Sequence, residues 1–346
     1  MALRPETQAI RPSRRLTCRE RQETPAPVPD LVVSLLLILA GCALLYVGGD
    51  MLVSASTFIA NRIGMSPIAI GATVVAIGTS APEFSVSLDA ALSGHSGISV
   101  GNVVGSNVCN IILVLGLCAL LRPVTVSRDV YRIDFPILIF VSAVFTFMVN
   151  DALISRLEGA FLGSGLLAYV VWNLRRAAED EELGELLGEE VAEALGEDEQ
   201  NWLMPVGRAL LGIAFLGLGA KWLVDGSLQT LAPYALSEAA IGITVVALGT
   251  SVPEIGTSII AARKGHGDLA VGNAIGSSVF NLLGVLGATA SIRPLPANDV
   301  DLMDGAILIA TSVAGLVLVA RPGGIGRVQG TVLIVTYGLY LATAIF

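Results

Sequence analysis

Two stretches of this chain repeat one another: GATVVAIGTSAPE at residues 71–83 and GITVVALGTSVPE at residues 242–254. The second follows the first by 171 residues, and the likeness continues beyond both. Between 71–113 and 242–284 the two copies agree at 22 of 43 positions without a gap. The sequence therefore predicts an internal duplication, in which each half is one copy of the same structural unit.

The repeats lie in strongly apolar sequence. Of 346 residues, 54% are hydrophobic and 14% are charged, and the mean hydropathy is +0.76. Soluble proteins carry about 25% charged residues. Recurring apolar runs of about 18 residues or more predict an integral membrane protein, with the lipid bilayer as its surroundings. No basic helix is present, so no nucleic-acid partner is expected.

Ten apolar spans are predicted, five on each side of an acidic stretch. They cover residues 31–59, 66–93, 100–121, 133–150, 153–173, 204–231, 237–262, 270–291, 302–320 and 328–346. An odd number of spans per copy makes equivalent helices cross the membrane in opposite directions. The expected fold is an all-α membrane protein of ten transmembrane helices, arranged as two inverted-topology five-helix repeats with broken helices at a central site.

The chain is expected to divide into four parts. Residues 1–29 form a polar N-terminal tail that we expect to be disordered, and 30–173 form the first five-helix repeat. An acidic loop at 174–203 precedes the second repeat at 204–346. Residues 179–199 hold 11 of the 29 acidic residues, so the net charge of −9 largely reflects this loop. The loop lacks the ligand order of an EF-hand and is predicted to be a solvated connector.

The basic residues predict an orientation. With the N-terminus outside, the loops predicted to face inward hold 11 Arg and Lys, and those predicted to face outward hold two. The six arginines of residues 1–29 point the other way. We give the distributed loops more weight and predict an inner (plasma) membrane protein with both termini outside and the 174–203 loop in the cytoplasm.

Two predicted spans contain a helix-breaking motif, GTSAPE at 78–83 and GTSVPE at 249–254. Proline cannot donate the helical hydrogen bond, and its ring clashes with the preceding turn. The break is expected to leave free carbonyl groups. They are expected at Ala76 and Ala247, and near Thr79 and Thr250. In lipid, such backbone is expected only where it lines a site or cavity.

A glutamate follows each break, at Glu83 and Glu254. A charge at mid-bilayer costs at least about 3 kcal/mol, so two equivalent carboxylates indicate a cation that neutralises them. Carboxylates, carbonyls and hydroxyls form an all-oxygen set that suits Ca²⁺ or Na⁺. Without Cys or His it does not suit zinc or copper. The ions are expected as cargo, and no cofactor is predicted.

A second repeated motif contributes further polar groups, GNVVGSNVCN at 101–110 and GNAIGSSVFN at 272–281. In each, a serine and an asparagine four residues apart share one helical face. These pairs are Ser106 with Asn110 and Ser277 with Asn281. We expect them to line the same cavity as the two glutamates.

These motifs resemble the alpha-repeats of the calcium/cation antiporter superfamily, in its prokaryotic sodium/calcium exchanger branch. G-T-S-x-P-E and G-N-x-x-G-S each occur twice. The G-N-x-x-E motif typical of the proton/calcium branch is absent. The resemblance implies a secondary active antiporter, not an enzyme, that exchanges sodium for calcium by alternating access. It further implies a monomer and electrogenic calcium extrusion, with three sodium ions exchanged for one calcium ion.

The resemblance also implies ligand roles. Glu83 and Glu254 would be shared by calcium and sodium, and Thr79 and Thr250 would give backbone oxygens to calcium. The flanking sodium sites would consist of the Ala76 and Ala247 carbonyls with Thr79, Ser80, Ser106, Thr250, Ser251 and Ser277. Asn110 and Asn281 would line the middle position. Some relatives, including potassium-dependent ones, carry Asp where this chain has Asn281, so the amide disfavours potassium co-transport.

Other functions remain open on the residues alone. Proton coupling, or transport of Mn²⁺ or Mg²⁺, would use the same two-glutamate site. A passive cation channel would need no counter-ion. The enzymatic alternative is an intramembrane aspartyl protease, suggested by Gly48-Gly49-Asp50, but the duplication preserves glutamate instead of a second catalytic aspartate.

Overall fold

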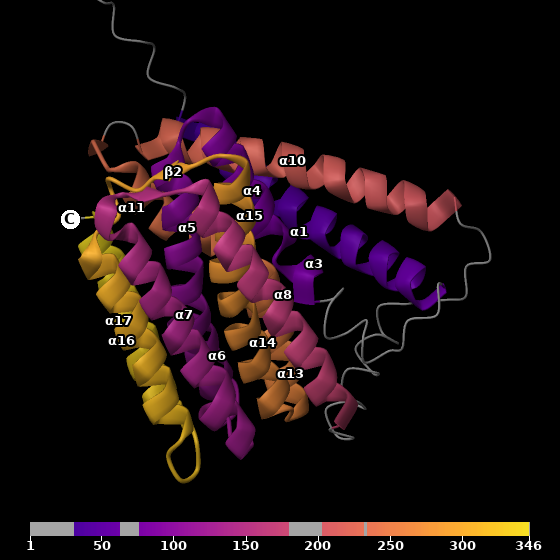
Figure 1. Ribbon diagram of the computed structural model, residues 1–346, viewed down its shortest axis with the longest axis vertical. Helices are drawn as coiled ribbons and strands as arrows, with labels where there is room; N and C mark the ends of the chain where they lie inside the picture. The colour runs from indigo at the N-terminus through magenta and orange to yellow at the C-terminus, as the bar shows by residue number, and fades with distance from the viewer. Residues whose placement is uncertain (1–30, 63–75, 180–202, 232–233, 346) are drawn as a thin grey trace, which may run out of the picture.

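The structure, a computed structural model, is almost entirely helical (Figure 1). It describes residues 31–62, 76–179, 203–231 and 234–345. Within these ranges, eight helices are long and apolar enough to cross a membrane, or nine if one bent pair counts as a single span. The predicted tail and most of the predicted acidic loop lie outside the described residues, as does part of the predicted span 66–93. The all-helical membrane fold is confirmed, whereas the count of ten stays a prediction.

The first half contains α1 (Leu31–Arg62), α3 (Ala76–Thr79), α4 (Ala81–Ser93), α5 (Ser96–Val108), η2 (Cys109–Val114), α6 (Leu115–Leu121), η3 (Val130–Asp134), α7 (Phe135–Met148), η4 (Val149–Asp151), β1 (Leu153–Ile154) and α8 (Arg156–Glu179). The second half contains α10 (Leu203–Leu231), α11 (Glu238–Ile241), η6 (Gly242–Val246), α12 (Ala247–Thr250), α13 (Val252–Lys264), α14 (Gly267–Phe280), η7 (Asn281–Val285), α15 (Leu286–Ile292), β2 (Leu295–Pro296), α16 (Leu302–Val319) and α17 (Arg327–Ile345). Helix α8 continues to Glu179, six residues past the predicted end of its span at 173.

The opening helices of the two halves, α1 and α10, pack against each other in opposite directions. A Cβ added at Gly41 would lie 2.9 Å from the carbonyl oxygen of Gly219, and one added at Gly48 would lie 2.9 Å from that of Gly212. Contacts that advance along α1 therefore step backward along α10. A shift of 171 residues turns the first contact into the second, so the two contacts are equivalent under the sequence repeat. Small residues at these points let the two backbones approach.

A second pair of contacts follows the same rule. Gly116 of α6 meets Gly330 of α17, and Gly287 of α15 meets Gly159 of α8. The 171-residue shift converts one contact into the other. Each of these contacts joins a helix of one half to a helix of the other, so equivalent pairs of helices pack the two halves together.

The centre of the bundle is occupied by α5, whose 13 residues are all buried. Large apolar side chains instead cover the outer helices, including Leu39 on α1, Phe147 on α7, Leu157 on α8 and Val328 on α17. An apolar outer surface around a tightly packed centre is what a bilayer requires.

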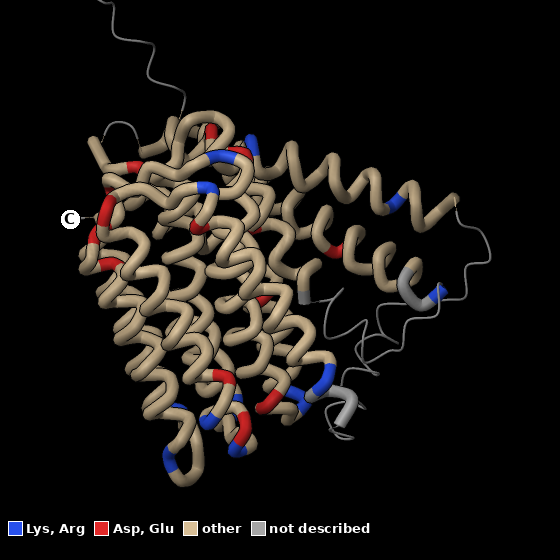
Figure 2. Tube along the Cα trace, viewed as in Figure 1, with Lys and Arg blue, Asp and Glu red and all other residues tan. Residues whose placement is uncertain are grey.

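Charged residues gather at the two ends of the bundle (Figure 2). At one end, Arg122 donates to the carbonyl of Arg263 at 3.4 Å, and Val124 pairs with Ile325. The loops predicted to lie inside at 122–132, 263–264 and 321–327 therefore share this end, which is rich in arginine.

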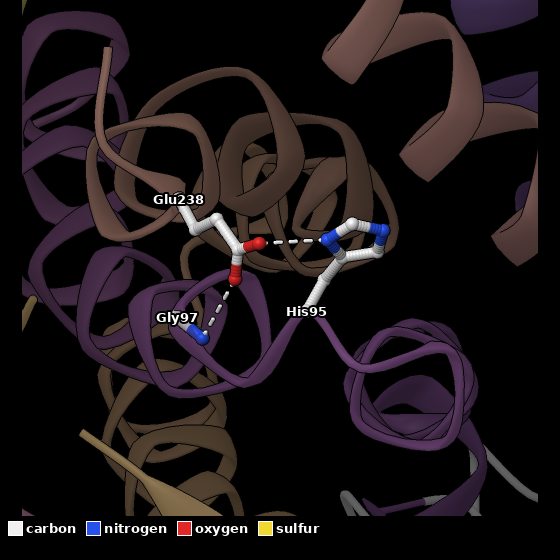
Figure 3. A network of polar contacts seen from close by, with 3 residues as sticks. All are labelled: His95, Gly97 and Glu238. Atoms are coloured by element: carbon white, nitrogen blue, oxygen red, sulfur yellow. Dashed lines mark hydrogen bonds and ion pairs between the residues drawn. The ribbon is translucent and has the colours of Figure 1, made fainter. Parts of the chain in front are cut away.

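The opposite end carries β1, β2 and the salt bridge shown in Figure 3. His95 Nδ1 lies 2.7 Å from Glu238 Oε1, and the Gly97 amide donates to Glu238 Oε2 at 3.2 Å. The α5 N-terminus lacks a side-chain cap of its own. A carboxylate from the other half satisfies one of its free amides and suits the helix dipole.

Candidate functional site

Both predicted helix breaks are confirmed. In the second half, the helix ending at Thr250 and the helix beginning at Val252 meet at a bend of 49°. The first half breaks at the equivalent place, between α3 and α4. The junction residues Ser80 and Ser251 have nearly the same backbone angles, φ −87° and ψ 9° against φ −80° and ψ 7°. A proline in the first turn makes each new helix begin there.

The breaks place each glutamate in the first turn of a new helix, Glu83 in α4 and Glu254 in α13. Both side chains are completely buried. Helix N-termini favour a negative charge, which lowers the cost of an ionised carboxylate there. In the part of the chain that the structure describes, neither glutamate forms an ion pair with a basic side chain.

Several buried polar atoms near the breaks have no hydrogen-bond partner among the described residues. They are Oε2 of Glu83, both carboxylate oxygens of Glu254, Oγ of Ser80, and the amide oxygen and nitrogen of Asn110 and of Asn281. Buried polar groups normally have partners, and leaving them without any is costly. A cation bound among these oxygens would satisfy them.

Packing brings these groups together from both halves. Helix α4, which carries Glu83, packs against η7, which begins at Asn281. In the equivalent contact, α13 with Glu254 packs against η2, which contains Asn110. Both η2 and η7 are π-helical turns inside longer helices, a distortion common at functional sites.

Hydrogen bonds join the halves directly at the site. The hydroxyl of Ser251 donates to Glu83 Oε1 at 3.2 Å. The hydroxyls of Ser106 and Thr250 lie 3.4 Å apart. Helix α14, which carries Ser277, packs on α3, which ends at Thr79.

The twelve predicted site residues thus lie on the two breaks and on the two helices that pack against them. Thr79 is half-buried. Eight others are as buried as the glutamates or nearly so: Ser80, Ser106, Asn110, Ala247, Thr250, Ser251, Ser277 and Asn281. Ala76 is the first residue of α3. Among the described residues, no three of His, Cys, Asp and Glu gather as a metal-binding group.

The expected free carbonyl at Ala247 is not free in this structure. Its oxygen accepts from the Ser251 amide at 3.1 Å and from the Thr250 hydroxyl at 3.2 Å. The position of the proline explains the difference, because a proline in a helix removes the hydrogen bond to the carbonyl group four residues earlier. For Pro253 that residue is Gly249, so the proline itself releases a different carbonyl.

Sequence reasoning missed a pair of equivalent asparagines beside the site, the buried Asn102 and the half-buried Asn273. Asn102 donates to the Ser87 hydroxyl at 3.0 Å and to the Glu83 carbonyl at 3.3 Å. Its repeat partner Asn273 donates to the Ser258 hydroxyl at 2.8 Å. These bonds tie α5 to α4 and α14 to α13. The signal was present, because the asparagine and the serine recur at the same 171-residue offset.

Comparison with known proteins agrees with this geometry. The family described as sodium/calcium exchanger protein matches residues 33–175 and 204–346, two segments separated by the same 171 residues as the sequence repeat. The chain therefore belongs to this family, whose members are transporters, and is a multi-pass membrane protein.

Three similar proteins illustrate the relationship. Inner membrane protein YrbG of Escherichia coli is 37% identical over 271 residues, which cover 76% of this chain and 81% of YrbG. Sodium/calcium exchanger MaX1 of Methanosarcina acetivorans is 30% identical over 348 residues, covering 91% and 99%. A solved structure of the sodium-calcium exchanger NCX_Mj, soaked with sodium and strontium, is 30% identical, covers 91% of this chain and 99% of its own, and superimposes with a TM-score of 0.60.

Proposed function

We propose that this protein is a secondary active antiporter that exchanges sodium for calcium at the site between the two helix breaks. The observation that carries the proposal is the pair of fully buried glutamates, one from each half, without a basic partner in the described chain. The surrounding oxygens belong to carboxylates, carbonyls, hydroxyls and amides. Such a set is suited to hard cations.

In the proposed architecture, ten helices form two five-helix repeats of opposite orientation. The antiparallel contact of α1 with α10 supports it, as do the contacts related by the 171-residue shift. In an inverted repeat, the two halves can exchange conformations about the pseudo-two-fold axis that relates them, which opens the site to the other side of the membrane. We propose that α1 and α10 move against the remaining helices in this step.

The proposed ion stoichiometry follows from charge. Two ionised glutamates give −2, which one Ca²⁺ neutralises, whereas three Na⁺ leave +1. Each cycle would then move one net charge, which is worth about 2.3 kcal/mol per 100 mV. The sodium gradient and a negative interior would both drive calcium out of the cell. The amide of Asn281 adds no third negative charge, which supports exchange without potassium.

The proposed orientation places the arginine-rich end in the cytoplasm and both termini outside. Clustering of basic loops at one end of the bundle supports it, because such loops remain on the inner side of the membrane (Figure 2). The acidic stretch between the halves would then be cytoplasmic.

The decisive test is calcium uptake into sodium-loaded proteoliposomes by the wild type, Glu83→Gln and Glu254→Gln. We expect uptake that requires the outward sodium gradient in the wild type and falls at least tenfold in both variants, because each loses half of the site charge. Glu238→Gln makes the same chemical change at a half-exposed position outside the site and should retain uptake.

Three other results would redirect the proposal. Uptake that ignores sodium but follows a proton gradient would replace the coupling ion. Movement of Mn²⁺ or Mg²⁺ in place of calcium would replace the substrate. Calcium flux without any counter-ion would indicate a passive channel.

A further inference from the structure

The hydroxyl of Thr250 lies between two groups that can only accept a hydrogen bond, while the Ser106 hydroxyl, 3.4 Å away, can donate to it. The Thr250 oxygen is 3.1 Å from Asn102 Oδ1 and 3.2 Å from the carbonyl oxygen of Ala247. A hydroxyl has one proton, so it can donate fully to only one of them at a time. Which acceptor receives the proton decides the state of the Ala247 carbonyl.

That carbonyl has two lone pairs, and both are engaged. One accepts from the Ser251 amide at 3.1 Å and the other from the Thr250 hydroxyl. When Thr250 donates to Asn102 instead, one lone pair of Ala247 becomes available to a cation. The backbone bond from Ser251 need not change.

Asn102 is held so that its oxygen faces Thr250. Its side chain is completely buried, and its amide nitrogen donates to the Glu83 carbonyl and to the Ser87 hydroxyl. A backbone carbonyl can only accept, which fixes the NH₂ group on that side and the oxygen on the other. The acceptor offered to Thr250 is therefore set by the helix that carries Glu83.

We propose that Asn102 is a positioning residue for sodium binding, which draws the Thr250 proton away from the Ala247 carbonyl and so frees that carbonyl as a ligand. The inference rests on the proposed function, in which Ala247 belongs to a flanking sodium site. It also links the halves, because Asn102 lies in the first and Ala247 in the second. Calcium, whose proposed ligands do not include Ala247, depends less on this bond.

The test measures sodium and calcium dependence separately in Asn102→Leu, which removes the acceptor at similar volume. In proteoliposomes, we expect the half-saturating sodium concentration to rise about tenfold, while that of calcium changes less than twofold. Asn107→Leu is the matched control, since Asn107 is a fully buried asparagine of the same helix and makes no hydrogen bond to Thr250 in the described chain. It should leave the sodium dependence within twofold of the wild type.

A double-variant cycle separates this role from a structural one. Thr250→Val removes the hydroxyl, so Ala247 can no longer be blocked by it. We therefore expect Asn102→Leu combined with Thr250→Val to show the same sodium dependence as Thr250→Val alone. If Asn102→Leu does not yield folded protein, Asn102→Ala removes the same acceptor with less bulk and carries the same expectation.

The inference is overturned if the Asn102 variant keeps the wild-type sodium dependence, if calcium and sodium shift equally, or if the two substitutions add independently. These outcomes differ from failure of the proposed function, which the wild type reports by itself. If the wild type shows no sodium-dependent calcium transport, both the proposed function and this inference fail.

Discussion

Glu83 and Glu254 occupy equivalent positions, yet their surroundings differ. Glu83 accepts a hydrogen bond from Ser251, while neither carboxylate oxygen of Glu254 has a partner among the described residues. An ionised carboxylate that is buried without compensation destabilises a fold. Glu254 therefore depends more strongly on a bound cation than Glu83 does.

This asymmetry predicts a stability change in the protein without ions. Glu254→Gln removes a buried charge, so we expect it to melt at a higher temperature than the wild type in sodium-free buffer with chelator. Calcium should stabilise the wild type, by about 2.7 kcal/mol at 100 times its Kd, and should not stabilise the variant.

Thermal unfolding of the detergent-solubilised proteins, with and without calcium, measures both effects. Asp225→Asn is a suitable control, because Asp225 is a half-exposed acid paired with Lys221 at 3.3 Å. A wild type and Glu254→Gln that melt alike without ions would show that the carboxylates carry no net charge in that state.

At the scale of helices, the contact between α1 and α10 depends on glycine. A Cβ added at Gly219 would lie 2.9 Å from the carbonyl oxygen of Gly41 and 2.9 Å from the Leu45 amide nitrogen. Both are backbone atoms, so relief requires the helices to separate. Two residues earlier on the same helix, no described atom lies within 4 Å of a Cβ added at Gly217.

We therefore expect Gly219→Ala to destabilise the protein by about 1–3 kcal/mol, as overpacking usually does. Gly217→Ala should be neutral or stabilising by up to about 1 kcal/mol, because alanine favours the helix. Thermal unfolding of the two variants side by side is the measurement. Equal shifts would show that α1 and α10 do not pack through this glycine.

The elements that sequence predicted best are those set by local chemistry. Pro82 and Pro253 break their helices because proline has no amide hydrogen, and this rule can be applied to the sequence alone. The partners across the breaks could not be predicted in this way. Asn102 meets Thr250 across 148 residues, and Glu238 caps α5 across 141 residues, so these bonds depend on how the halves dock.

The same distinction explains the error at Ala247. The motif predicted that the helical backbone hydrogen bonds are disrupted there. It did not reveal that the neighbouring Thr250 hydroxyl donates a hydrogen bond to the Ala247 carbonyl. Side-chain rotamers inside a break depend on which acceptors the opposite half presents. The site residues could thus be selected from the repeat, whereas their hydrogen-bond state required the packed structure.

The whole molecule is polar along one axis, with basic loops at one end and the inter-half salt bridge of His95 at the other (Figures 2 and 3). Between the ends, the proposed site holds two carboxylates, and the ions bound to them would be exposed to each side of the membrane in turn. The net charge that exchange moves across the membrane is therefore a property of the complete transport cycle. It can be tested without altering any residue.

Under the proposed stoichiometry, calcium uptake into sodium-loaded vesicles exports one net positive charge per cycle, so an inside-positive potential should accelerate it. A tenfold inward potassium gradient with valinomycin sets about 60 mV, which at about 2.3 kcal/mol per 100 mV corresponds to roughly a tenfold change in the calcium gradient at equilibrium. An inside-negative potential of the same size should shift it equally in the opposite direction. Omitting valinomycin provides the control for potassium itself. Uptake that is indifferent to the potential would mean two sodium ions per calcium ion, because only that ratio leaves the two-glutamate site equally charged in both loaded states.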